Sequence, residues 1–186
     1  MAKIAICVGH SRICDSGAVS AVGYTEREYN GMVAKLLAIH LQRLHFNTIV
    51  FDKYPFTGYG KSMIWLAKQI KDAECSLALE LHFNSADDPA ANGHEFLHGA
   101  DSLSGQRAAK CFSDGMLRDF PAFRSRGLLP VTAGMNGRGF LYGTHCPAVI
   151  LEPFFGSNLT EARFFGGRHS ELAQCYAGAV QRYCAS

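Results

Sequence analysis

Four side chains that can bind a metal or move a proton stand at the ends of apolar runs in this 186-residue chain. His10 follows one such run, His82 follows a second, Glu152 closes a third, and Glu26 opens the first long helical pattern. In open α/β sheets, ligands bind where the strands reach their carboxyl ends. Two histidines and a carboxylate gathered there form a typical zinc ligand set, which leaves a fourth position open for water.

The spacing divides these residues into two chemical roles. His10, Glu26 and His82 come from three different elements and are candidates for the three zinc ligands. Zinc lowers the pKa of a coordinated water to roughly 7, so hydroxide becomes available at neutral pH. Glu152 ends a different strand and is the candidate general base, which later returns the proton as an acid to the leaving group.

Each of these residues also has an ordinary structural explanation. A histidine after a strand is often only hydrogen-bonded, Glu26 suits the positive end of its helix, and Glu152 can pair with a surface cation. Glu80 precedes His82 by two residues, so its side chain points to the same face of the sheet, where a buried carboxylate is costly unless paired. It is the alternative candidate for supporting the ligands. His145, just before the last strand, is a further candidate for lining the pocket.

Hydrophobic periodicity predicts strands that alternate with helices. The expected strands cover residues 4–8, 47–51, 76–81, 95–97, 140–142 and 147–152. The expected helices cover residues 26–44, 62–73, 102–119 and 160–184, the last interrupted at Gly166-Gly167. Residues 121–137 are expected to be irregular. Thr25, followed three residues later by Glu28, predicts a capping box at the start of the first helix.

This alternation predicts an α/β fold with a mostly parallel twisted sheet and helices on both faces, a three-layer sandwich. The run 76–81 is almost continuously apolar, which is typical of a strand covered on both faces. The sequence contains no internal repeat, linker or low-complexity segment. We therefore expect residues 1–186 to form one domain, and a monomer is favoured.

Composition excludes several classes of function. The formal net charge is +2, whereas nucleic-acid binding needs a clustered basic face. No run approaches the roughly 20 apolar residues of a membrane span, so no stable membrane association is expected. The start of the chain has no signal-peptide pattern, which predicts synthesis in the cytoplasm. Seven cysteines without a CxxC pair indicate a reducing compartment during folding.

Three blocks of sequence resemble the zinc-dependent N-acetylmuramoyl-L-alanine amidases of the amidase-3 family. The first block contains a strand that ends in Gly-His, an Asp-x-Gly-Ala loop, and a glutamate followed four residues later by Asn. The second block is a strand that ends in His-x-Asn, followed by a Gly-x-Glu strand. The third block is a strand that ends in glutamate and is followed by a Phe-x-Ser-Asn segment. The residues that carry them are Gly9-His10, Asp15–Ala18, Glu26 and Asn30; His82, Asn84, Gly93 and Glu95; and 147–152 with Phe155, Ser157 and Asn158.

The resemblance implies that His10, Glu26 and His82 bind one Zn²⁺ and that Glu152 is the catalytic acid/base. The substrate would be the amide between N-acetylmuramic acid and L-alanine in peptidoglycan. Asn84, Glu80, Arg12 and His145 are further candidates for binding substrate or supporting the ligands. A bare catalytic domain without a signal peptide suits a phage or prophage lysin, a bacteriolytic endolysin that reaches the cell wall or periplasm through holin-type lesions.

Two rival functions fit the same scaffold. A zinc carboxypeptidase or other small-substrate amidohydrolase needs a fixed cation for a terminal carboxylate, and Arg12, Arg126 and Arg138 lie in expected loops. A non-catalytic wall-binding module would keep the fold without the reaction. The intact set of four site residues argues against that module.

Overall fold

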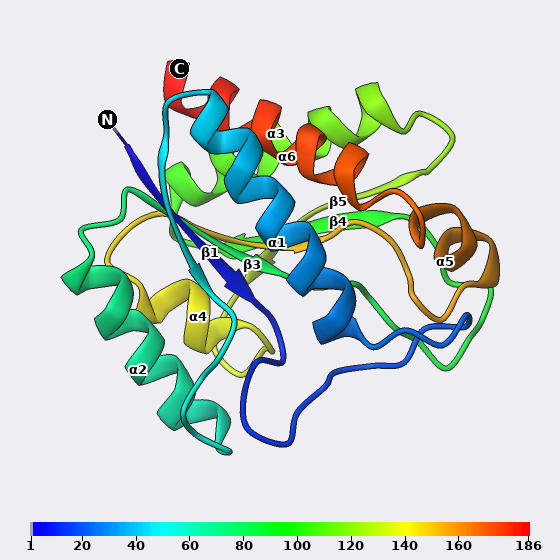
Figure 1. Cartoon of the computed structure of the whole chain (residues 1–186), viewed down its shortest axis with the longest axis horizontal. Coiled ribbons are helices and arrows are strands. Elements are labelled where there is room, and N and C mark those ends of the chain that lie inside the picture. The colour runs from blue at the N-terminus through cyan, green and yellow to red at the C-terminus, as the bar shows by residue number, and fades with distance from the viewer. Residues whose placement is uncertain (1) are drawn as a thin grey trace.

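The apolar runs of the sequence become the strands of one six-stranded sheet in a computed structural model that describes residues 2–186 (Figure 1). The strands are β1 (Lys3–Val8), β2 (Asn47–Phe51), β3 (Leu77–Leu81), β4 (His94–Gly99), β5 (Ser125–Val131) and β6 (Ala148–Glu152). Their order across the sheet is β2-β1-β3-β6-β4-β5. β3 and its two neighbours therefore occupy the middle of the sheet, and all three run parallel.

β4 and β5 run opposite to the other four strands of the sheet. β4 pairs antiparallel with β6 and parallel with the edge strand β5. The expectation of a mostly parallel sheet is confirmed. Because β1, β3 and β6 run together, their carboxyl ends meet at one edge of the sheet, which is where the site residues gather.

Six helices connect and cover the strands. They are α1 (Glu26–Arg43), α2 (Tyr59–Asp72), α3 (Leu103–Asp119), α4 (Arg138–Gly143), α5 (Leu159–Phe165) and α6 (His169–Ala185). The predicted capping box starts α1: the Glu28 backbone N–H donates to the Thr25 hydroxyl, and the Thr25 N–H donates to the Glu28 carboxylate. This cap places Glu26 in the first turn of α1, where its side chain faces the sheet edge.

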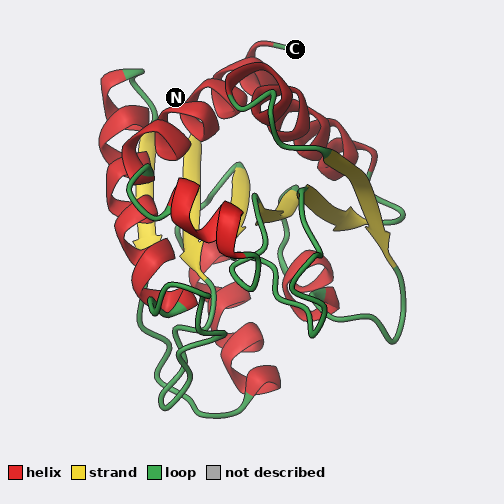
Figure 2. Cartoon of the chain, turned by 90° about the vertical axis from the view of Figure 1, so that its right-hand side faces the viewer, coloured by secondary structure: helices red, strands yellow, loops and turns green. Residues whose placement is uncertain are grey.

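Helices cover both faces of the sheet (Figures 1 and 2), and a separate hydrophobic core lies on each face. Alternate residues of each central strand enter different cores, so Ile4 and Ile6 pack with α1, α3 and α6, whereas Ala5 and Cys7 pack with α2 and α4. This double burial explains why the strands read as continuous apolar runs rather than alternating ones. The predicted three-layer α/β class is confirmed.

The predictions for residues 121–142 are wrong at two places. Residues 125–131, expected to be irregular, form β5, an edge strand that tolerates Pro130 because one of its sides has no strand partner. Residues 140–142, expected as a short strand, lie in α4, whose Phe140 and Leu141 are buried in the core beside α2. A three-residue apolar run is too short for its period to distinguish strand from helix.

Elsewhere the element boundaries differ by a few residues. The helix expected over 62–73 begins earlier, at Tyr59, and the last helix is interrupted at Gly166-Gly167 as predicted, which gives α5 and α6.

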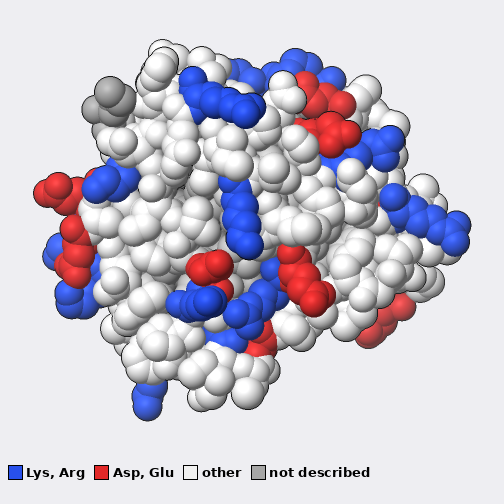
Figure 3. Space-filling view, viewed as in Figure 1, with Lys and Arg blue, Asp and Glu red and all other residues white. Residues whose placement is uncertain are grey.

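Within residues 2–186, no helix is both long and apolar enough to cross a membrane. Basic and acidic side chains alternate over the face that carries α1 and α6 (Figure 3).

Candidate metal centre and active-site cavity

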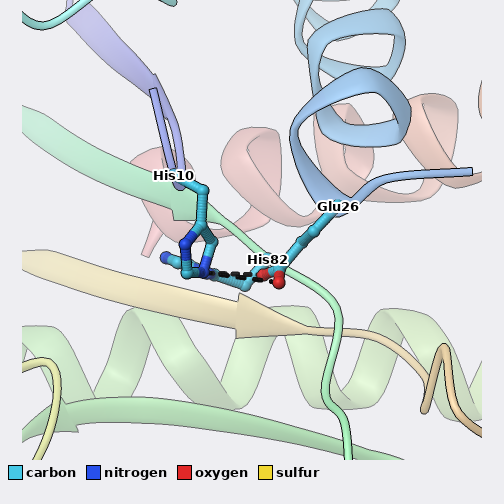
Figure 4. A group of neighbouring side chains, drawn as sticks. All are labelled: His10, Glu26 and His82. Carbon is cyan, nitrogen blue, oxygen red and sulfur yellow. Dashed lines mark hydrogen bonds and ion pairs between the residues drawn. The ribbon is translucent and has the colours of Figure 1, made fainter. Parts of the chain in front are cut away.

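Three potential ligands converge where β1 and β3 end and α1 begins (Figure 4). His10 Nε2 lies 3.3 Å from one carboxylate oxygen of Glu26, and His82 Nδ1 lies 2.7 Å from the other. One nitrogen of each ring and one oxygen of Glu26 lie within 4.8 Å of one another. Two imidazoles and a carboxylate at this spacing suit a four-coordinate zinc ion with one open position.

The outer nitrogen of each histidine faces a second carboxylate. His10 Nδ1 lies 3.0 Å from Asp15 Oδ1, and His82 Nε2 lies 3.5 Å from Glu80 Oε2. A carboxylate behind a ligating histidine fixes its tautomer and ring orientation, an arrangement that accompanies most protein metal sites. The residues present therefore fit the zinc ion that the sequence implies.

Asp15 is itself held in place by its neighbours. The Arg12 guanidinium donates to Asp15 Oδ2, with Nε at 2.9 Å, and the Gly17 N–H donates to Asp15 Oδ1 at 3.2 Å. Burial alone would raise the pKa of Asp15, but the bonds from Arg12 and His10 outweigh burial and hold it below its usual value. Asp15 thus stays ionised behind His10.

Two glycines allow the ligands to come this close. A Cβ on Gly9 would lie 2.3 Å from the His82 ring, and a Cβ on Gly17 would lie 2.7 Å from Glu26 and 2.8 Å from His10. Gly17 also has a φ of 70°, which L side chains rarely adopt. His10 itself takes a left-handed φ of 56° as the chain turns away from β1.

Glu26 and His82 shift each other's pKa in opposite directions. Burial by itself would lower the pKa of His82, but its bonds to Glu26 and Glu80 raise that pKa well above its usual value. Burial would likewise raise the pKa of Glu26, yet the bond from His82 brings it below its usual value. The pair therefore favours an ionised carboxylate facing the histidines, which is the form that binds a cation.

Glu152 stands apart from this triad, at the end of β6. Its Oε2 atom is buried and has no hydrogen-bond partner among residues 2–186. Burial raises the pKa of Glu152 to about 8, and the charges of Glu26, Glu95 and Glu80 act in the same direction. A carboxyl group with a pKa near neutrality and a free oxygen is suited to proton transfer.

A cavity of about 570 Å³ brings the triad and Glu152 together on the face of the sheet covered by α2 and α4. Its wall has an apolar part, formed by Met63, Leu97 and Ile150, and a polar part that includes Asn136 and Arg138. Residues 134–139, the loop before α4 and the start of that helix, also line the cavity, and a Cβ on Gly137 would meet Ile150 at 2.5 Å.

The four additional candidates from the sequence occupy different places. Arg12, Glu80 and Asn84 line the cavity, and Asn84 Nδ2 donates to Glu95 at 2.7 Å. His145 does not line it: the side chain is exposed in the loop that enters β6. Because β6 runs parallel to β3, a residue before β6 lies at the opposite edge of the sheet from the strand ends that carry the site.

Three parts of the site were not identified as site residues from the sequence. In the sequence Asp15 is part of a loop motif, and a carboxylate five residues after a candidate ligand is a usable signal for a supporting group. The walls formed by Tyr59 and by residues 134–139 depend on how α2 and α4 pack across the sheet. No local pattern reveals that packing.

Comparisons with known proteins identify one matching family. The family model for N-acetylmuramoyl-L-alanine amidases matches residues 4–182. No curated protein gives a match.

Solved structures share the fold over the whole chain. The N-acetylmuramoyl-L-alanine amidase AmiC2 of Nostoc punctiforme superposes with a TM-score of 0.85 at 19% identity, covering 100% of this chain and 98% of its own. The catalytic domain of CwlV, an N-acetylmuramoyl-L-alanine amidase from Bacillus (Paenibacillus) polymyxa var. colistinus, superposes with a TM-score of 0.81 at 22% identity. This match covers 100% of this chain and 99% of the CwlV domain. The catalytic domain of the CD27L endolysin, which targets Clostridia difficile, gives 0.80 at 22% identity, covering 98% of each chain.

Proposed function

The chain belongs to the N-acetylmuramoyl-L-alanine amidase family, and from this premise we propose that it hydrolyses the amide between N-acetylmuramic acid and L-alanine in peptidoglycan with the help of one zinc ion. The observation that carries this proposal is the arrangement of one cavity. His10, Glu26 and His82 present ligand atoms within 4.8 Å of one another, and Glu152 lines the same cavity with a free buried oxygen.

The proposed role of each residue follows from its chemical group. His10, Glu26 and His82 hold the metal. When bound, zinc polarises the amide carbonyl and makes a water molecule more acidic. Glu152 accepts the proton of the attacking water and then donates it to the departing amine of L-alanine. The raised pKa of Glu152 suits this double role, and the charge of a nearby cation would bring that pKa closer to neutrality.

The cavity wall is suited to the two sides of this substrate. The lactyl group of the muramic acid and the L-alanine residue each carry a methyl group, and the apolar wall of Met63, Leu97 and Ile150 can accept such groups. Positioning the amide against this wall would hold its carbonyl near the ligands and its nitrogen near Glu152.

The carboxypeptidase alternative is less well supported. It needs a free cation for the terminal carboxylate of a peptide. Arg12 is paired with Asp15, and Arg126 Nε donates to Glu95 at 2.9 Å. Arg138 lies over the Tyr142 ring at 4.8 Å and is the remaining candidate. Loss of peptide binding on removal of Arg138, with C-terminal amino acids as products, would favour this alternative.

We further propose that the whole chain is one catalytic domain, monomeric, that acts on the cell wall as a phage or prophage lysin released by a holin-type route. The family match over residues 4–182 and the fold shared with an endolysin catalytic domain support this role. Production in a bacterial host with and without a holin should give lysis only with the holin.

Metal exchange tests the proposed chemistry. Removing metal with a chelator should abolish clearing of a peptidoglycan suspension, and adding one equivalent of Zn²⁺ should restore it. His82→Ala should bind no zinc and show no activity. Full activity in protein that contains less than a few per cent of any divalent metal would refute the zinc mechanism.

A further inference from the structure

We propose that Glu80 is a positioning residue for the metal centre: it faces His82 Nε2 and holds that ring with Nδ1 directed toward the metal position. This inference rests on the proposed function, because it assumes that His82 is a metal ligand. It starts from one contact, the 3.5 Å between Glu80 Oε2 and His82 Nε2.

Glu80 is buried and has few partners. The residue is 4% exposed, and within residues 2–186 its only ion-pair contact is His82. It lies on the central strand β3, where its neighbours in the sheet are Cys7 on one side and Ile150 on the other. A carboxylate in such surroundings is costly unless a positive charge compensates it.

Asp15 provides the contrast within the same site. It occupies the equivalent position behind His10, but Arg12 neutralises it and the Gly17 N–H also donates to it. Glu80 has neither an arginine nor a lysine within ion-pair distance in the described part of the chain. Among the described residues, the group that pairs with Glu80 is thus the His82 ring, and Glu80 can act on the metal centre only through that ring.

The His82 ring is held on three sides. Its Nδ1 meets Glu26 at 2.7 Å, its Nε2 faces Glu80, and its plane lies so close to Gly9 that a Cβ there would approach to 2.3 Å. A neutral imidazole has one N–H, and Glu80 as an acceptor favours that N–H at Nε2. When a metal is bound, Nδ1 would be free of the proton that it shares with Glu26 in the hydrogen bond of 2.7 Å, and its lone pair would be available to the metal.

This role predicts different effects on folding and on metal binding. Among residues 2–186 the Glu80 side chain has one ion-pair contact and no hydrogen bond, so replacing it with an apolar side chain of similar length should not destabilise the metal-free protein. With metal, the same replacement removes the partner of His82, and losses of this kind cost about 10- to 100-fold in metal affinity. A residue with only a structural role would change stability and leave metal affinity alone.

The experiment compares Glu80→Met, Glu80→Gln and wild type. The zinc dissociation constant is measured by competition with a chromophoric chelator, and the melting temperature of the metal-free protein by calorimetry. Glu80→Met should bind zinc about 10- to 100-fold more weakly, with a metal-free melting temperature equal to or above that of wild type. Glu80→Gln keeps an acceptor for His82 and should lose less affinity than Glu80→Met.

Glu95→Gln is the matched control. Glu95 is a carboxylate on the same face of the sheet and contacts neither histidine, so this variant removes a nearby negative charge without touching the ligands. Its zinc affinity should match that of wild type. In zinc-loaded wild type, long-range proton–nitrogen NMR should show His82 protonated at Nε2.

The outcomes separate this inference from the proposed function. Zinc affinity of Glu80→Met equal to that of wild type, or His82 protonated at Nδ1, would overturn the role of Glu80 while leaving a zinc-binding, active wild type intact. If Glu80→Met does not fold, equal zinc affinities of Glu80→Gln, Glu95→Gln and wild type would overturn it. A wild type that binds no zinc would overturn both.

Discussion

Glu95 lies directly opposite Glu152 where β4 and β6 pair antiparallel. Two like charges in such a cross-strand pair repel each other. Asn84 and Arg126 each donate to Glu95, at 2.7 Å and 2.9 Å, whereas one oxygen of Glu152 has no partner among residues 2–186. The pair is therefore asymmetric: Glu95 is held as a partnered carboxylate, and Glu152 is the member that is free to exchange a proton.

Replacing Glu95 by Gln should shift the pH dependence of the reaction. Burial is the main cause of the raised pKa of Glu152, and the charge of Glu95 adds to it. A general base must be ionised to accept a proton, so activity rises with pH through its pKa. Glu95→Gln should move the acidic limb of the pH profile of kcat to lower pH. An acidic limb that moves to higher pH would contradict the coupling.

Replacing Glu152 by Gln should separate chemistry from metal binding. The side chain keeps its shape but can no longer transfer a proton, and the loss of acid–base catalysis costs about 10²- to 10⁴-fold in rate. Zinc content should remain at one per chain, because Glu152 is not one of the three clustered ligands. Glu152→Gln with wild-type kcat would remove Glu152 from the mechanism, and loss of zinc together with activity would make it a ligand instead.

Replacing Gly17 by Ala should damage the metal centre through steric contact. The new Cβ would press on both Glu26 and His10. Gly23→Ala is the matched control, since Gly23 also has a positive φ, of 95°, but nothing lies within 4 Å of its added Cβ. Both variants should lose about 1–2 kcal/mol of stability from backbone strain.

Only Gly17→Ala should also lose zinc affinity, by about tenfold or more because two ligands are displaced. The chelator competition assay measures this difference directly. Equal zinc affinities for the two variants would show that the close approach of Gly17 to the ligands is not needed for metal binding.

His94 gives the protein a specific sensitivity to acid. It is fully buried at the start of β4, beside the Phe96 ring, and neither ring nitrogen has a partner among residues 2–186. Burial lowers its pKa from 6.5 to about 4. Between pH 6.5 and pH 4, His94 is protonated in the unfolded chain but remains neutral in the folded chain. The free energy of unfolding therefore falls as the pH decreases from 6.5 to 4.

His94 alone should lower the free energy of unfolding by about 3 kcal/mol, and this decrease should be complete below pH 4. His94→Leu should remove this contribution, so its advantage over wild type should grow as the pH falls through this range. Urea unfolding of both metal-free proteins at several pH values gives the difference, in which the contributions of other groups cancel. Parallel stability curves for the two proteins would contradict the burial of a neutral His94.

The fold was largely predictable because its central strands are buried on both faces. That burial produces continuous apolar runs, and the capping box at Thr25 marks the start of α1 in the sequence itself. The sequence predictions are wrong for β5 and α4 because the structure of these two elements depends on partners that are distant in the sequence. β5 is an edge strand held by β4, and α4 is held against α2 by two buried side chains.

The candidate site was partly predictable for a related reason. His10, His82 and Glu152 end strands that run in the same direction, so their meeting follows from topology, and Glu26 follows from the helix cap. Because His145 precedes β6 instead of following it, the same topology places His145 at the edge of the sheet opposite the site. The carboxylate behind His82 also follows from strand spacing, because Glu80 precedes His82 by two residues and lies on the same face of β3. The apolar part of the cavity wall arises from packing between distant elements, which no local spacing encodes.

The most direct test of the central claim is mass spectrometry of the soluble products released from purified peptidoglycan, with and without a zinc chelator. The amidase mechanism predicts intact stem peptides with free L-alanine amino termini, which disappear when the chelator is present. Shortened stem peptides still attached to muramic acid, or the same products in the presence of chelator, would contradict it.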